Sequence, residues 1–389
     1  MPRGHSLKLV GALLALLSIG AVERPQRAFT TLDNRRLSES GVDRRIGQLM
    51  AANQVTGLGV AVIRQGKIVF IKSYGYASIE DKAPLTPGTI MYGASLTKAT
   101  FAWFLMQLVD EGRVDLDKPI GDYLKKPLPD YDGWGDLKGD ERWRQLTLRK
   151  LMNHTSGFAN LRWLEEDRKL RFHRDPGTRY GYSGEGIRLA QFVLEEGLGL
   201  DVGKEMQTRI FDRFRMNDTS MTWRDSYEGR LAYGYTADGK RQEFARRKKA
   251  GAIGSMDTTL ADWARFLAAV VRGDGMSRPA HAAMIRPTVW IDSPVQFPTL
   301  TEERTDRWKG MKLGYAIGWG TFESRFGHAF FKEGHDDGTD NYAVCVDGRQ
   351  SCILLLANDN RATRIFVPLV NELLGPLDLP ADWEGYGRP

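Results

Sequence analysis

A long apolar run in the first third of the chain, residues 99–109, constrains the fold more than any other feature. Its sequence, ATFAWFLMQLV, is rich in helix-forming side chains and is too long for an ordinary strand. We therefore expect a buried helix here. Gly112 follows the run and can end the helix by adopting the left-handed backbone conformation of a C-terminal cap.

Ser95 and Lys98 lie at the expected start of this helix, three residues apart and so on one face. A serine hydroxyl becomes a good nucleophile when a base accepts its proton. A lysine can be that base only if its pKa falls from about 10.4 toward neutrality, and burial and the positive end of a helix dipole both favour this fall. The pair predicts a nucleophile and its base, although a surface serine and lysine show the same spacing.

Segments typical of strands lie near both ends of the chain, and most helix-like segments lie between them. The strand-like segments are residues 57–63, 68–71, 315–320, 327–331, 341–346 and 352–357. The simplest fold class is α/β of the α+β type, with one antiparallel sheet flanked by helices. We expect residues 38–100 plus 310–389 to form this sheet domain and residues 101–309 to form an inserted, mainly helical domain, with a cleft between them as the site.

The N-terminus has the pattern of a secretory signal. Arg3 and Lys8 precede an apolar stretch at residues 9–22, which is shorter than the roughly 20 residues of a membrane span. We expect residues 1–20 to be a signal peptide; a buried helix and an uncleaved anchor are the alternatives. The expected protein is periplasmic or secreted and has no stable membrane span after signal cleavage.

The charge and the cysteines limit the expected partners. With 55 Lys and Arg against 49 Asp and Glu, the net charge of +6 is too mild to indicate a nucleic-acid partner. The basic cluster at residues 246–249 is either a solvated loop or a rim that attracts anionic partners. Two cysteines and six scattered histidines predict no metal site and no cofactor.

Cys345 and Cys352 flank a predicted hairpin turn, and the position of this turn decides whether they pair. A turn at Gly348–Arg349 places the two cysteines opposite each other, at a separation that suits a disulfide. A turn at Asp347–Gly348 shifts the register and separates them. Both possibilities are open.

Two further segments carry side chains that are suited to catalysis. Tyr182 lies in a Gly-rich bend before a helix-like segment and could relay a proton from the nucleophile to the leaving group, although such tyrosines also serve in packing. Lys332 lies at the end of a strand, where its charge could lower a neighbouring pKa. After it, Gly334 leaves room for substrate along the strand, and the His335 N–H could donate to an oxyanion. The alternative is a polar strand end in solvent.

These motifs, in this order, resemble those of the penicillin-recognising serine hydrolases: Ser95-x-x-Lys98, Tyr182-Ser183-Gly184 and Lys332-Glu333-Gly334. That group includes class C β-lactamases, D-Ala-D-Ala carboxypeptidases and related esterases. Residues 151–157, LMNHTSG, are similar to its LLxHTSG motif, and the resemblance covers roughly residues 46–374. It implies a β-lactamase/DD-peptidase-like fold with a five-stranded sheet. It also implies that Ser95 forms an acyl-enzyme, that Lys98 and Tyr182 move the proton, and that the Ser95 and His335 amides hold the oxyanion.

Two departures from the family pattern affect the expected substrate. Gly184 replaces an asparagine that contacts the substrate amide, and Glu333 replaces a threonine that helps to bind the substrate carboxylate. A carboxylate at position 333 repels a carboxylate in the substrate. We therefore expect an exported serine hydrolase that acts on a small-molecule ester or amide, with esterase-like specificity. The alternatives are a β-lactamase or D-Ala-D-Ala carboxypeptidase/D-aminopeptidase, and a penicillin-binding or sensing module without turnover.

Overall fold

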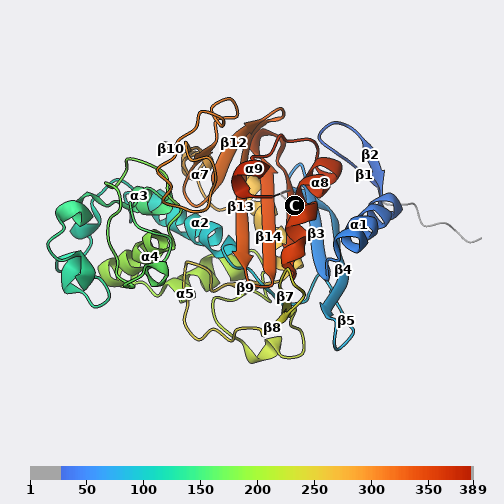
Figure 1. Ribbon diagram of the computed structural model, residues 1–389, viewed down its shortest axis with the longest axis horizontal. Helices are drawn as coiled ribbons and strands as arrows, with labels where there is room; N and C mark the ends of the chain where they lie inside the picture. Colours follow the sequence, from blue (N-terminus) through green and yellow to red (C-terminus); the bar gives the residue numbers. More distant parts are fainter. Residues whose placement is uncertain (1–27, 387–389) are drawn as a thin grey trace, which may run out of the picture.

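The computed structural model describes residues 28–386, in which a central antiparallel sheet is covered by helices (Figure 1). The sheet has nine strands in the order β10-β11-β12-β13-β14-β15-β3-β4-β5. In this order their bounds are Val289–Trp290, Gly314–Tyr315, Gly320–Ser324, Gly327–Asp336, Thr339–Val346, Ser351–Ala357, Gly57–Arg64, Lys67–Ser78 and Ala83–Pro84. The middle of the sheet thus joins N-terminal and C-terminal segments, as the sequence predicts.

The expected number of five strands is wrong. Three of the nine strands, β5, β10 and β11, have two residues each, which is too short to give a recognisable alternation of apolar and polar side chains. The single strand expected at residues 315–320 is also wrong, because the chain turns between β11 and β12. Gly318 has a φ of 76° there, and a Cβ on it would lie 2.5 Å from the Cβ of Ala102.

Helices cover both faces of the sheet and enclose two cores. The helices α1 (Glu39–Asn53) and α8 (Thr363–Leu373) cover one face, and α2 (Leu96–Asp110), α6 (Leu260–Arg272) and α7 (Arg278–Ile285) lie on the other side. The side chains of β15 alternate between the two cores, since Ile353 and Leu355 pack in one and Leu354 and Leu356 in the other. A sheet buried on both faces places its strand ends inside the molecule, where a site can be shielded from water.

The buried helix predicted from the apolar run is confirmed as α2. Every residue from Leu96 to Leu108 is buried, Ser95 is the N-cap residue, and Glu111 is the C-cap residue. Gly112 follows with a left-handed φ of 69°. Because α2 lies within the core, the side chains at its N-terminus have little freedom to move.

The middle of the chain is mainly helical with long loops, and much of it lies to one side of the sheet (Figure 1). Its further helices include α3 (Leu148–Met152), α4 (Gly184–Leu198) and α5 (Val202–Met206), and α9 (Ala381–Glu384) follows near the C-terminus. Three small pairs complete the fold: β1 (Ala28–Thr30) with β2 (Arg36–Ser38), β6 (Met91–Tyr92) with β9 (Asp257–Thr258), and β7 (Gly234–Tyr235) with β8 (Arg241–Gln242). Within residues 28–386, none of the helices has the length and apolar character needed to cross a membrane. The expected signal peptide, residues 1–20, lies outside the described residues.

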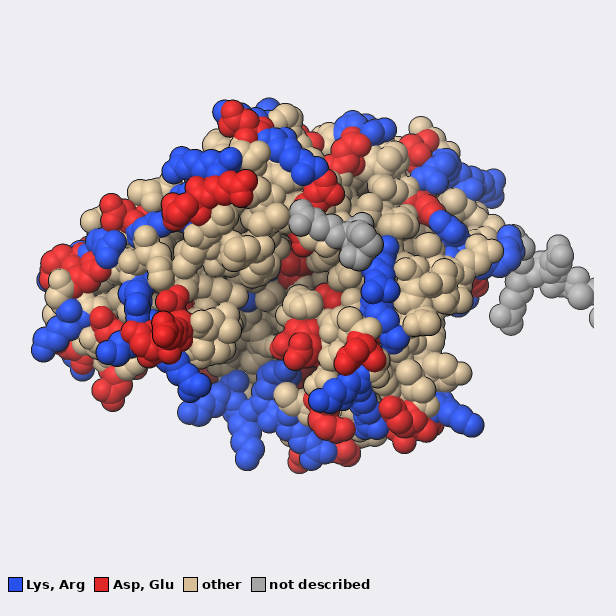
Figure 2. All heavy atoms as spheres, in the orientation of Figure 1, with Lys and Arg blue, Asp and Glu red and all other residues tan. Residues whose placement is uncertain are grey.

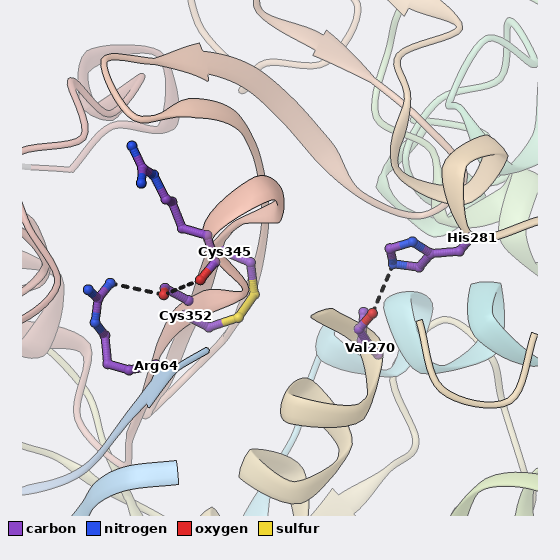
Figure 3. The surroundings of a disulfide bond; sticks show 7 residues. Arg64, Val270, His281, Cys345 and Cys352 are labelled. Carbon is purple, nitrogen blue, oxygen red and sulfur yellow. Dashed lines mark hydrogen bonds between the residues drawn. A yellow bond between two sulfur atoms is a disulfide. The ribbon is translucent and has the colours of Figure 1, made fainter. Parts of the chain in front are cut away.

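Cys345 and Cys352 form a disulfide between β14 and β15 (Figure 3). They are opposite each other in the strand register, as the first of the two turn alternatives requires. Residues 347–350 close the hairpin, and Gln350 adopts a left-handed φ of 44°. The Arg64 guanidinium donates a hydrogen bond to the Ser351 hydroxyl beside the disulfide, which ties the neighbouring strand β3 to this turn (Figure 3).

Candidate active site

Ser95 lies at a sharp turn where the chain enters α2. The residue before it, Ala94, has a left-handed φ of 46°, a conformation that costs a non-glycine residue about 1–2 kcal/mol. The turn is held in place because the Gly93 N–H donates to the Met256 carbonyl at 2.9 Å and the Leu96 N–H donates to the Gly93 carbonyl. Strained backbone of this kind occurs at functional sites, where the surrounding structure enforces it.

Lys98 contacts the Ser95 hydroxyl from one turn further into α2. Its Nζ lies 2.7 Å from Ser95 Oγ and 2.6 Å from the Ile253 carbonyl oxygen. The side chain is buried, and this burial, helped by the charge of Lys332, lowers the pKa of Lys98. A neutral amine at this distance can accept the serine proton, so the geometry and the electrostatics both suit a general base.

Tyr182 reaches the same hydroxyl from the loop before α4. Its OH donates to Ser95 Oγ at 3.1 Å. Burial raises the pKa of this phenol, but the charges of Lys332 and Lys98 oppose burial and bring the pKa of Tyr182 below its usual value. Both lysine Nζ atoms lie 5.2 Å from the centre of the tyrosine ring. The phenol is therefore placed to exchange a proton with the Ser95–Lys98 pair.

The segment at residues 151–157, LMNHTSG, supports the loop that carries Tyr182. The carbonyls of His154 and Thr155 accept hydrogen bonds from the N–H groups of Gly181 and Gly177. The His154 ring accepts from the Ser183 N–H through Nδ1 and packs 4.3 Å from the Tyr182 ring. Burial and the nearby lysines lower the pKa of His154 well below its usual value, so the ring is neutral and acts as a support.

Lys332 is buried on β13 beside Tyr182 and forms an ion pair with Glu333. Its Nζ donates to Glu333 Oε1 at 2.7 Å, and the Gln296 side chain donates to the same oxygen at 2.8 Å. Burial alone lowers the pKa of Lys332, but the Glu333 carboxylate and Tyr182 reverse this effect and raise it. Lys332 thus provides a fixed positive charge beside Tyr182.

The C-terminal half of β13 faces the start of α2 along a free strand edge. Strand β12 pairs with β13 only as far as Phe331, so residues 332–336 have no strand partner on that side among residues 28–386. A Cβ on Gly334 would lie 2.8 Å from the Gly93 carbonyl and 3.3 Å from the Ser95 nitrogen, which explains the glycine. His335 lines the cavity and pairs through Nδ1 with Asp340 at 2.7 Å; its N–H as an oxyanion donor stays a prediction.

Gly184 is the first residue of α4, and its N–H donates to the Asn160 side-chain oxygen at 3.0 Å. A Cβ on Gly184 would lie 2.8 Å from the Leu161 side chain. The site therefore has no room for an asparagine side chain at position 184 without movement of this neighbour. Asn160, which sequence reasoning missed, presents an amide to the cavity from a different loop.

A cavity of about 700 Å³ opens above Ser95, Lys98 and Tyr182. Figure 2 shows a hollow in the centre of this face of the molecule, with both acidic and basic side chains around it. Besides the predicted residues, its wall contains several that sequence reasoning missed, namely Asn160, Trp163, Gln296, Phe297, Glu384 and Tyr386. These come from separate loops and from the segment after α8, and none belongs to a recognisable motif. Within residues 28–386, no group of His, Cys, Asp and Glu side chains is arranged to hold a metal ion.

The basic cluster at residues 246–249 contacts the wall of this cavity through Arg247. Arg247 forms an ion pair with the buried Asp257 at 3.0 Å, and its guanidinium stacks 3.6 Å from the centre of the Tyr92 ring, which lines the cavity. Arg246 pairs with Glu228 on the surface. Arg247 therefore has a structural role, and neither alternative from the sequence describes this residue.

Comparisons with known proteins agree with this geometry. A sequence model of the beta-lactamase family matches residues 42–368. The chain is similar to a beta-lactamase of Escherichia coli (strain K12), with 27% identity over 236 residues, or 58% of this chain and 59% of that protein. It is also similar to penicillin-binding protein 4 of Amycolatopsis lactamdurans, with 25% identity over 86% of this chain and 88% of that protein. The match thus spans less than two thirds of the first of these relatives.

Two solved structures share the fold. One is the octameric penicillin-binding protein homologue from Pyrococcus abyssi, with a TM-score of 0.68 and 19% identity over 87% of this chain and 78% of that chain. The other is the D-alanine carboxypeptidase AmpC from Burkholderia cenocepacia, with a TM-score of 0.65 and 20% identity over 82% of this chain and 93% of that chain. At this identity the likeness concerns the fold alone.

Proposed function

This chain belongs to the beta-lactamase family of serine hydrolases, and from that premise we propose that it cleaves small ester or amide substrates through an acyl-enzyme on Ser95. One observation carries the proposal: Lys98 Nζ and Tyr182 OH lie within 2.7 Å and 3.1 Å of the same Ser95 oxygen. In this mechanism Lys98 accepts the serine proton while Ser95 Oγ attacks the carbonyl carbon. Tyr182 passes a proton to the leaving group, and water then releases the acid and frees the serine.

We propose esterase-like specificity because two features work against a substrate that carries a carboxylate. Glu333 lines the cavity, and the ammonium group of Lys332 is already engaged in an ion pair with the Glu333 carboxylate. An anionic group near Glu333 therefore meets like charge in a partly buried site, where repulsion is only weakly screened. Hydrolysis of simple neutral esters avoids this cost.

The test combines labelling with a comparison of substrates. A fluorophosphonate probe followed by mass spectrometry is expected to label Ser95. The enzyme is expected to cleave p-nitrophenyl acetate or butyrate faster than nitrocefin, and Ser95→Ala is expected to abolish ester cleavage without a change in melting temperature. Ser73→Ala is a matched control, since the Ser73 hydroxyl lies on β4 and does not line the cavity. Full activity in Ser95→Ala would refute the mechanism.

A second candidate function, turnover or binding of β-lactams or D-amino-acid peptides, is supported by the names of the relatives. Cleavage of nitrocefin at a rate typical of β-lactamases, without ester cleavage, would favour it. A stable covalent adduct of a fluorescent penicillin on Ser95 would instead favour a penicillin-binding or sensing module.

We also propose that the protein is exported to the periplasm or secreted. The charge and hydropathy of residues 1–20 support this, and so does the Cys345–Cys352 disulfide, because such bonds persist mainly in oxidising compartments. A fusion of residues 1–30 to a reporter that is active only after export tests the proposal. An inactive reporter would contradict it.

A further inference from the structure

The side chains that line the cavity carry an excess of acidic groups. Among the described residues that line it, four are carboxylic acids, Glu333, Asp336, Asp340 and Glu384, and two are basic, Lys98 and His335. Lys98 must be neutral to act as a base, so it does not offset this excess during reaction. Even with Lys332, which is buried against Glu333, acidic groups outnumber charged basic ones around the described part of the cavity, whereas the chain as a whole carries a net charge of +6.

Two of these acids, Asp340 and Glu333, have cationic partners. Carboxylate oxygens that accept no hydrogen bond from the described residues are found on Glu333 and Glu384. Asp340 pairs with His335, and Glu333 uses Oε1 to pair with Lys332. The other oxygen of Glu333 has no hydrogen-bond partner among the described residues, although only 6% of this residue is exposed. Glu384 accepts from the Tyr342 hydroxyl through Oε2, and its Oε1 also lacks a partner in that part of the chain. Buried carboxylate oxygens without partners favour a donor from a ligand.

The two glutamates affect each other electrostatically. Burial, together with the negative charge of Glu333, raises the pKa of Glu384 well above its usual value. The charged form of Glu384 is therefore disfavoured unless a cation lies beside it, and a cation in the cavity near both groups would stabilise both carboxylates. A second anion would add to the repulsion.

In the proposed mechanism the leaving group departs beside Tyr182, and Glu333 lines the same cavity. Lys332 forms an ion pair with Glu333, and its Nζ also lies 5.2 Å from the centre of the Tyr182 ring. Tyr182 is the residue that we propose protonates the leaving group. Gln296, which donates to Glu333, is followed by Phe297, whose ring lies 5.5 Å from the Tyr182 ring. The aromatic rings of Tyr182, Phe297 and Tyr386 all line this cavity and can also contact a bulky cation through their faces.

We infer that the cavity selects esters or amides whose leaving group carries an ammonium group, held at the carboxylates of Glu333 and Glu384. This inference rests on the proposed acyl-enzyme function and adds the charge of the leaving group. The selected substrate therefore carries a positive charge, opposite to the negative charge of a peptide that ends in a carboxylate.

Three acetyl thioesters that differ in the charge of the leaving group test the inference with the wild-type protein. They are S-[2-(dimethylamino)ethyl] thioacetate, whose protonated amine is a cationic N–H donor, its neutral carbon analogue S-(3-methylbutyl) thioacetate, and S-acetyl-3-mercaptopropionate, and the released thiol is measured with a chromogenic disulfide reagent. We expect kcat/KM to be at least tenfold higher for the cationic thioester than for the neutral one, and lowest for the anionic one. The preference should weaken at high salt, since ionic strength screens charge.

The variant Glu384→Gln keeps an acceptor for Tyr342 but removes the acid. We expect it to reduce the ratio of cationic to neutral kcat/KM at least fivefold. Glu372→Gln is the matched control, because Glu372 lies on α8 and pairs with Arg45 away from the cavity. It should leave the ratio unchanged, and melting temperatures show whether both variants fold.

The outcomes separate this inference from the proposed function. Equal or faster cleavage of the neutral or anionic thioester would overturn the inference, as would cleavage of p-nitrophenyl acetate with no cleavage of any thioester. An unchanged ratio in a folded Glu384→Gln variant would overturn the role of Glu384. If the wild-type protein does not cleave p-nitrophenyl acetate, the proposed function is refuted, and the inference with it.

Discussion

Replacing Lys332 with methionine removes a buried positive charge from the reacting groups and should shift the pH dependence of hydrolysis. Lys332 lowers the pKa of both Lys98 and Tyr182. A general base is active when deprotonated, so kcat/KM rises as the pH passes the pKa of that base. Without the Lys332 charge this pKa is higher, and the acid limb of the profile moves to higher pH. The acid limb moves in the same direction whether Lys98 or Tyr182 acts as the base.

The size of the shift follows from the positions of the two lysines. Each Nζ lies 5.2 Å from the centre of the Tyr182 ring, so the two nitrogens are separated by about 10 Å at most. At an effective dielectric constant near 20, two unit charges at that distance interact by roughly 1–2 kcal/mol, which is about one pKa unit. We therefore expect the acid limb in Lys332→Met to move up by about one pH unit and kcat/KM on the acid limb to fall about tenfold.

The assay is the pH profile of kcat/KM for p-nitrophenyl butyrate in the wild type, Lys332→Met and the double variant Lys332→Met/Glu333→Gln. The Glu333 carboxylate raises the pKa of Lys98, but less than Lys332 lowers it, so the double variant should show a smaller upward shift. Lys332→Met also leaves Glu333 buried without a counter-charge, which destabilises the fold by about 3–5 kcal/mol, so circular dichroism must confirm folding. An acid limb that stays in place or moves to lower pH in folded Lys332→Met would refute the electrostatic reasoning.

Three other substitutions test separate parts of the structure. Tyr182→Phe should lower kcat for ester cleavage by about 10²–10⁴-fold, the usual contribution of a positioned proton donor, while fluorophosphonate labelling persists more slowly; unchanged kcat would exclude the phenol from proton transfer. Replacing Cys345 and Cys352 by alanine opens a disulfide of sequence separation 7, so the free energy of unfolding in urea should fall by about 2.5 kcal/mol, and a reductant should then have no further effect. Gly334→Ala places a Cβ 2.8 Å from the Gly93 carbonyl, so kcat/KM should fall at least tenfold; wild-type activity would show that β13 can move away without cost.

Features determined by neighbouring residues are predictable from this sequence. The α2 helix and the Ser95–Lys98 contact depend on one continuous segment, in which an apolar run sets the burial and a spacing of three residues sets the face. Tyr182 and Lys332 come close to Ser95 and Lys98 only through tertiary structure. The sequence indicates this only because its motifs resemble, in the same order, those of the penicillin-recognising serine hydrolases. The structure then shows the physical reason, because the carbonyl of His154 fixes the Tyr182 loop.

Features that depend on distant segments are not predictable in this way. Phe297 and Glu384 reach the cavity from separate parts of the chain, and no local pattern marks either of them. The two-residue strands at the sheet edges have too few residues for a period. The sequence does not decide whether the two cysteines pair for a related reason, since the choice between adjacent turns depends on a single left-handed residue, Gln350.

The burial of α2 links hydrolysis to the integrity of the whole molecule. Because every residue from Leu96 to Leu108 is enclosed by the core, the nucleophile cannot leave its position unless the surrounding helices separate. In a denaturant series, loss of turnover and loss of the near-ultraviolet signal of the buried tryptophans should therefore coincide. A simple colorimetric rate would then report the fraction of molecules that remain natively packed.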